Sequence, residues 1–137
     1  LQASSTANGH TDEQLCEYVD LLIEAMQTNK FLYIAHPDIF LFDKNSNTYN
    51  KQMSRLCQEA KKTNTPLEIN FLGIFDNRHY PNETFLEIAG KVGNKVIFGM
   101  DSHSTERAFD TCSLEKAKKL VAKYKLNLID SVEIKGI

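Results

Sequence analysis

The sequence predicts an α/β protein in which helices alternate with the strands of a parallel sheet. Apolar residues recur at helical spacing in four segments, and each segment is followed by a short apolar run typical of a buried strand. The order α-β-α-β-α-β-α-β calls for right-handed crossover connections, and therefore for parallel strands. At 137 residues the chain has the size of about one domain.

The first half of the chain contains two expected helices and two expected strands. Thr11 and Gln14 have the spacing of a capping box, and the apolar positions that follow predict a helix. Residues 31–35 and 66–71 are the expected strands, and the second opens with a proline, which a strand tolerates there. The polar segment 43–47 leads into the other helix. Its expected buried face consists of Tyr49, Met53, Leu56, Cys57 and Ala60.

The second half repeats this alternation. Residues 72–81 are expected to be a loop, and Asn82 is the expected N-cap of a third helix. Residues 95–100 form an expected strand, and Ser113 is the expected N-cap of a fourth helix. Residues 126–134 close the chain as a last strand-like segment. We find no internal repeat or linker that divides these elements.

The composition is that of an ordinary globular domain, with 42% hydrophobic residues and a net charge of −2. This charge, without a basic stripe, predicts no nucleic-acid partner. The apolar runs are far shorter than the ~20 residues that span a bilayer, so no membrane partner is expected. No secretory leader precedes the first helix, which predicts a cytoplasmic protein. The three cysteines lie in helical patterns and are expected to be reduced and buried.

Two strand ends carry residues that suit a metal site. Asp101 and His103 follow the strand at 95–100, and His36 follows the strand at 31–35. Carboxylate and imidazole are ligands that Zn²⁺, Mn²⁺ and Fe²⁺ accept. The carboxyl ends of parallel strands meet at one edge, where active sites of such folds lie. The alternatives are a backbone-bonded His36 and an Asx-turn at Asp101 followed by a surface histidine.

Three further side chains are candidates for substrate binding. Glu68 lies within a predicted strand, so it either faces solvent or meets a positive group in the site. Asn70 ends the same strand and can hydrogen-bond to a substrate or ligand. Arg78 follows in the next loop and either forks onto a phosphate or is solvated.

Four strings in this order resemble the PHP (polymerase and histidinol phosphatase) family. They are YIAHPD at 33–38, PLEIN at 66–70, YP at 80–81 and VIFGMDSHS at 96–104. The resemblance runs from about residue 11 to about residue 132 and is greatest to the bacterial histidinol-phosphate phosphatases. It implies a distorted seven-stranded βα (TIM-like) barrel with two or three divalent metal ions (Zn, Mn or Fe).

The resemblance also implies a function and site residues. The activity would be hydrolysis of L-histidinol phosphate, a small phosphorylated substrate, in histidine biosynthesis. His36, Asp101 and His103 would bind the metals, and Asp101 and His103 would belong to the catalytic centre. Arg78 would bind the phosphate, with Glu68 and Asn70 beside the substrate.

The chain departs from the family pattern because the opening His-x-His and other N-terminal ligands have no counterpart in it. Residues 11–137 therefore resemble the C-terminal half of such an enzyme, preceded by an unstructured or cut segment at 1–10. A start at Leu1 fits a trimmed product, a proteolytic fragment or a part of a larger gene. We expect the chain alone to be inactive. The missing half or self-association would cover its strand edges.

Two alternatives stay open at this point. One is another PHP-type phosphoesterase that acts on nucleotides or oligonucleotides. The other is a non-catalytic α/β domain whose histidines bind metal or satisfy a core. Metal content of the purified chain distinguishes the second from the rest.

Overall fold

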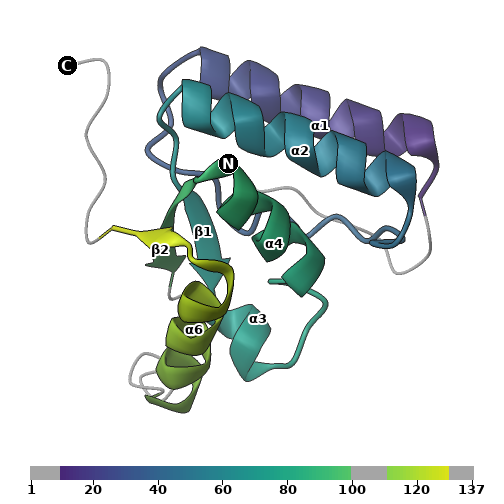
Figure 1. Cartoon of the computed structure of the whole chain (residues 1–137). Coiled ribbons are helices and arrows are strands. Elements are labelled where there is room, and N and C mark those ends of the chain that lie inside the picture. Colours follow the sequence, from purple (N-terminus) through teal and green to yellow (C-terminus); the bar gives the residue numbers. More distant parts are fainter. Residues whose placement is uncertain (1–9, 100–110, 130–137) are drawn as a thin grey trace.

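The computed structural model describes residues 10–99 and 111–129, which form a mixed α/β fold (Figure 1). The helices are α1 (Asp12–Gln27), α2 (Asn47–Lys62), α3 (Phe71–Phe75), α4 (Glu83–Val92) and α6 (Thr111–Tyr124). The strands are β1 (Leu67–Asn70), β2 (Lys95–Gly99) and β3 (Asn127–Leu128). The predicted alternation of helices with a parallel sheet is confirmed at this level.

The three strands form one parallel sheet in the order β1-β2-β3. Leu67 lies opposite Val96, and Val96 lies opposite Leu128. On the other side of β1, Ile34 makes a single parallel bridge to Leu67. The predicted strand at 31–35 is therefore reduced to one bridged residue. Beyond Ile34, the His36 amide is the next one that could bond to the backbone of β1. It donates instead to the side chain of Glu68, which ends the pairing.

The helix starts follow from local capping. The Gln14 amide donates to Thr11 Oγ1, and the Thr11 amide donates to Gln14 Oε1, so the predicted capping box is confirmed. Asn82 Oδ1 accepts from the amide of Phe85 at 2.8 Å and caps α4 as predicted. These side chains satisfy amides that have no partner within the helix.

Three predicted boundaries were wrong. The expected loop at 72–81 overlaps α3, whose start is held by Asn70 Oδ1, which accepts from the Gly73 amide. Ser113 is not an N-cap, because α6 already begins at Thr111. Within the described residues, the last predicted strand is limited to Asn127–Leu128, with one further bond from the Ile129 amide to the Val96 carbonyl, and residues 130–134 lie outside the described residues.

The helices pack on one another in chain order, α1 on α2, α2 on α4 and α4 on α6. Figure 1 shows α1 and α2 side by side, with α4 beneath them and α6 below the sheet. Their apolar faces and the strands share one core. Its fully buried members include Leu15, Val19, Met26, Ile34, Met53, Leu56, Leu67, Ile69, Leu86 and Val96.

The cysteines are free and lie in helices, as the sequence predicts. Cys57 is buried in α2 and Cys16 is partly buried in α1, but Cys112 is exposed on α6. The expectation of buried thiols is therefore wrong for Cys112. No helix within the described ranges combines the length and apolar character needed to cross a bilayer.

Candidate functional site

Polar side chains are buried together where β1 ends. Glu68 and Asn70, which belong to β1, are 7% and 1% exposed. His36 and Asp38, which follow the bridged residue Ile34, are 5% and 2% exposed. The structure thus brings together three of the predicted site residues, His36, Glu68 and Asn70. A carboxylate is rarely buried without partners, so each of these groups needs its contacts explained.

Glu68 is the centre of this group. Its Oε1 accepts from the backbone amide of His36 at 2.9 Å and from Asn70 Nδ2 at 3.0 Å. Its carboxylate lies over Gly99 of β2, where a Cβ would come within 1.8 Å of Oε2. Glu68 therefore does not face solvent, and two N–H donors take the place of the expected positive group. Asn70 Oδ1 in turn accepts from the Gly73 amide, which ties the group to α3.

Asp38 joins the same buried group, although sequence reasoning gave it no role. Its Oδ2 accepts from the Asn82 amide at 2.5 Å, and Asn82 Nδ2 donates to the Tyr49 hydroxyl at 2.7 Å. The pKa of Asp38 is raised to about 7. Burial is the main cause, the nearby charge of Glu68 adds to it, and the hydrogen bond from the Asn82 amide opposes it. The available signal was a charged residue two positions after His36 and directly before an apolar pair.

His36 carries two unusual features. Its φ angle is 27°, in the left-handed region that costs a non-glycine residue on the order of 1–3 kcal/mol. Its Nδ1 is buried and has no hydrogen-bond partner within the described residues. Its ring lies 5.5 Å from the ring of Tyr80, centroid to centroid. Such a nitrogen is free to bind a metal ion or a polar ligand.

Arg78 lies outside this buried group. Its guanidinium donates to the Tyr80 hydroxyl and to Asp76 Oδ2, both at 3.0 Å. Tyr80 also contacts His36, so it links Arg78 to the buried group without direct contact between the two. Arg78 lies on the wall of a cavity of about 460 Å³. The lining residues are Gly73, Ile74, Asn77, Arg78, Tyr80, Pro81, Glu83, Lys116, Lys119, Leu120 and Lys123.

The other predicted metal ligands, Asp101 and His103, lie outside the described residues. Across 10–99 and 111–129, no three His, Cys, Asp or Glu side chains form a group that could hold a metal ion. The free Nδ1 of His36 fits one ligand of such a site. The remaining ligands would have to come from Asp101, His103 and residues beyond those described.

Comparisons with known proteins assign no family to the chain. No family model, no curated protein and no solved structure matches it. The chemistry of the site therefore rests on its own residues.

Proposed function

We propose that this chain is the C-terminal part of a metal-dependent phosphomonoesterase of the PHP type that hydrolyses L-histidinol phosphate. One observation carries the proposal: the ring Nδ1 of His36 is buried and unpartnered among the described residues, while the backbone amide of the same residue donates to the buried carboxylate of Glu68 in β1. The neighbouring strand β2 ends at Gly99, and Asp101 and His103 follow it by two and four positions in the sequence. Active sites of parallel α/β folds lie at this edge of the sheet.

The order of the strands supports a barrel-like arrangement. Ile34, β1, β2 and β3 are neighbours in the order of the chain, all in parallel. The helices α2, α4 and α6, which lie between them in sequence, are neighbours in the same order. In a doubly wound sheet the strand order reverses at a switch point, whereas in a βα barrel it follows the chain. This succession fits half of a seven-stranded barrel.

The proposed chemistry divides between metal ions and protein side chains. Two or three bound divalent ions would supply an acidified water and offset charge on the phosphoryl oxygens. His36, Asp101 and His103 would hold them. Glu68 would position His36 through its backbone amide, and Arg78 would form a forked contact with the phosphate.

Glu68 and Asn70 remain proposed substrate-binding residues with a second task. Both bond to backbone amides, those of His36 and Gly73 respectively. They would therefore fix the turn that carries His36 and the start of α3 while leaving other lone pairs for a substrate. Loss of either hydrogen bond would therefore displace the turn that carries His36 or the start of α3, in addition to removing a contact with the substrate.

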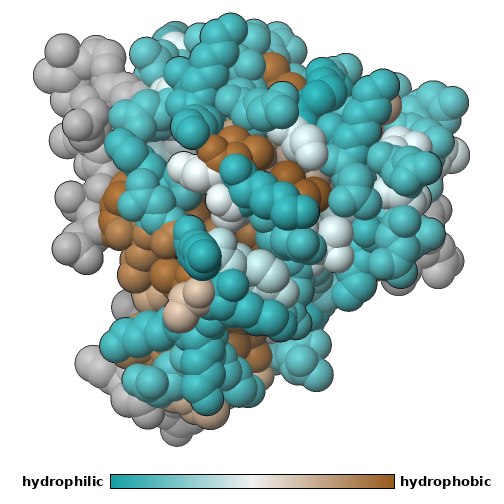
Figure 2. Space-filling model, viewed as in Figure 1, coloured by the Kyte–Doolittle hydropathy of each residue, from teal (hydrophilic) through white to brown (hydrophobic). Residues whose placement is uncertain are grey.

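A partner, either the missing N-terminal half or a second copy of the chain, is part of the proposal. Figure 2 shows hydrophobic residues gathered at the left of the view, where β2 and β3 lie in Figure 1. Ile97 and Phe98 of β2 are only half-buried, and Leu128 of β3 is 38% exposed. An apolar face of a sheet is normally covered by another element.

Metal binding by histidine variants tests the proposal. The affinity of the purified protein for Zn²⁺ and Mn²⁺ would be measured for His36→Gln and for the control His79→Gln. His79 follows Arg78 in the loop and bonds through Nε2 to the Ile39 carbonyl. The control variant therefore replaces one histidine that lies outside the proposed ligand set. We expect His36→Gln to lose about tenfold or more in affinity, and His79→Gln to retain it. Equal affinities in both variants would contradict the metal role of His36.

The same affinity measurement tests Asp101 and His103, and a phosphatase assay tests turnover. Asp101→Asn and His103→Ala should each reduce metal affinity by about tenfold or more. The 137-residue chain alone should not hydrolyse histidinol phosphate, because a multi-metal cluster needs ligands that it lacks. A monomer of this chain that turns over at an ordinary rate, roughly 1–10³ s⁻¹, would contradict the half-enzyme proposal.

A further inference from the structure

The cavity beside Arg78 has a strongly positive lining. Arg78 comes from the segment after α3, and Lys116, Lys119 and Lys123 come from α6. The lining contains one acid, Glu83, so four cations and one acid leave a net charge of +3. The whole chain carries −2. The lining of this cavity is therefore positive although the chain as a whole is slightly negative.

Ion pairing does not account for all of these cations. Arg78 pairs with Asp76 at 3.0 Å, and Lys123 pairs with Glu83 at 2.6 Å. Glu83 also accepts from the Tyr124 hydroxyl, which further occupies it. In the part of the chain that the structure describes, Lys116 and Lys119 have no ion-pair partner. They lie three positions apart on one helix face, where like charges repel unless an anion lies between them.

We propose that this cavity binds a small molecule with two anionic groups, of the diphosphate class. One group would contact Arg78, and the other would contact Lys116 and Lys119 on the α6 wall. A cavity of about 460 Å³ has room for more than a single phosphate and lies within the usual size of ligand sites. A guanidinium suits bidentate phosphate contact, and two lysines supply point charges for a second group.

This ligand is distinct from the substrate of the proposed function. Histidinol phosphate has one phosphate and a cationic amine, and Lys116 and Lys119 would repel the amine. Arg78 is common to both proposals, whereas Lys116 and Lys119 belong to this one only. Variants of the two lysines therefore test the cavity without touching His36 or the proposed metal ligands.

Calorimetric titration with inorganic pyrophosphate tests the inference on the full 137-residue chain. The titration would contain EDTA, so that bound metal cannot hold the probe, and low salt, because screening weakens such contacts. We expect pyrophosphate to bind about tenfold or more tightly than inorganic phosphate. The double variant Lys116→Gln/Lys119→Gln should weaken pyrophosphate binding by about tenfold or more.

The matched control is Lys118→Gln/Lys125→Gln. Both lysines are exposed, on or just after α6, and neither lines the cavity, so this control removes the same charge from the same region. It should weaken binding by less than about twofold. Equal loss in the two double variants, or pyrophosphate binding no tighter than phosphate binding, would overturn the proposal. Either result leaves the proposed function standing, because that is tested through metal affinity at His36.

Discussion

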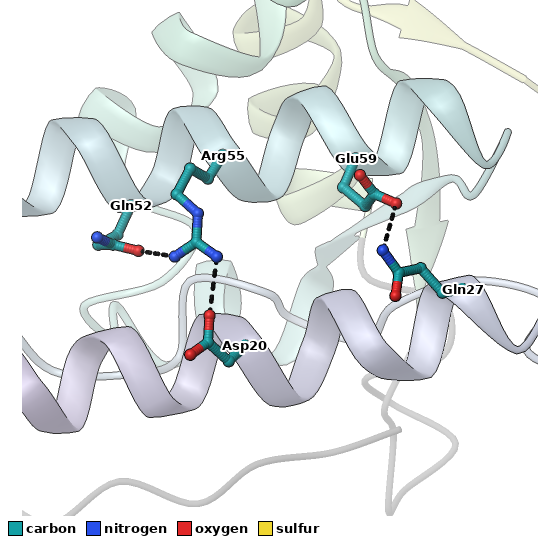
Figure 3. Close-up of polar contacts among 5 residues, drawn as sticks. All are labelled: Asp20, Gln27, Gln52, Arg55 and Glu59. Carbon is teal, nitrogen blue, oxygen red and sulfur yellow. Dashed lines mark hydrogen bonds and ion pairs between the residues drawn. The ribbon is translucent and has the colours of Figure 1, made fainter.

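The α1–α2 pair and the end of β1 use polar side chains in opposite ways. Between the helices, polar contacts lie at the surface: Arg55 donates to Asp20 at 2.8 Å, and Gln27 donates to Glu59 at 3.1 Å (Figure 3). Apolar side chains fill the space beneath them. At the end of β1 the polar side chains are themselves buried and bond to one another and to backbone amides.

The difference separates a region built for stability from one that costs stability. Exposed pairs such as Arg55–Asp20 add little, and the helix pair is held by apolar burial. The end of β1 instead contains two buried carboxylates, a left-handed His36 and an unpartnered ring nitrogen. Unfavourable features of this kind gather where a protein binds or reacts.

The largest expected effect is in the helix pair. Leu56 of α2 is fully buried, so Leu56→Ala should lower the free energy of unfolding by about 2–5 kcal/mol through lost burial and a cavity. Leu21 of α1 is 65% exposed, and Leu21→Ala should change it by less than about 0.5 kcal/mol. Urea unfolding measures both. Similar values for the two would break the distinction between a buried and an exposed helix face.

The next effect is a pH dependence that originates at the end of β1. Burial raises the pKa of Asp38 to about 7, above the unfolded value, so the folded state binds more protons between about pH 4 and pH 7. Stability should therefore fall as pH rises through this window, by up to about 4 kcal/mol. Asp38→Asn keeps an acceptor for the Asn82 amide and should flatten this slope. The measurement is the urea midpoint of the unaltered protein and of Asp38→Asn at about pH 4.5 and at about pH 8. An unchanged slope would mean that Asp38 is ionised in the fold.

A smaller effect separates hydrogen bonding from charge at Glu68. Glu68→Ala leaves the His36 amide and the Asn70 amide group without their acceptor, which should cost about 1–3 kcal/mol. Glu68→Gln keeps an acceptor oxygen and should recover most of this loss. Thermal unfolding of both variants is the measurement. If Gln is as destabilising as Ala, the negative charge rather than the acceptor holds the turn.

The smallest effect is expected for the surface pair Arg55–Asp20. The two side chains are 40% and 61% exposed, so a double-mutant cycle with alanine should give a coupling of about 0.2–1 kcal/mol. The coupling should shrink further in roughly 1 M salt. A salt-independent coupling above this range would place a structural polar network on the helix pair and remove the contrast with the end of β1.

Local patterns in the sequence were enough to locate most of the fold. The capping box at Thr11 and the N-cap at Asn82 are confirmed because caps and helical periodicity depend on neighbours within a few positions. The strand at 31–35 could not be placed in this way. Its extent depends on pairing with β1, which lies more than thirty positions away in the sequence. The pairing ends because the His36 amide donates to the Glu68 side chain.

For the candidate site, the sequence by itself determined the residue types and their places at strand ends. His36 and Asn70 were selected at the ends of predicted strands, Glu68 within a strand and Arg78 in the loop that follows it. Only the tertiary structure decided that Glu68 and Asp38 are buried and that Arg78 lines the same cavity as the lysines of α6. The physical reason is that burial and charge environment depend on segments far apart in the chain, whereas capping and periodicity are local properties.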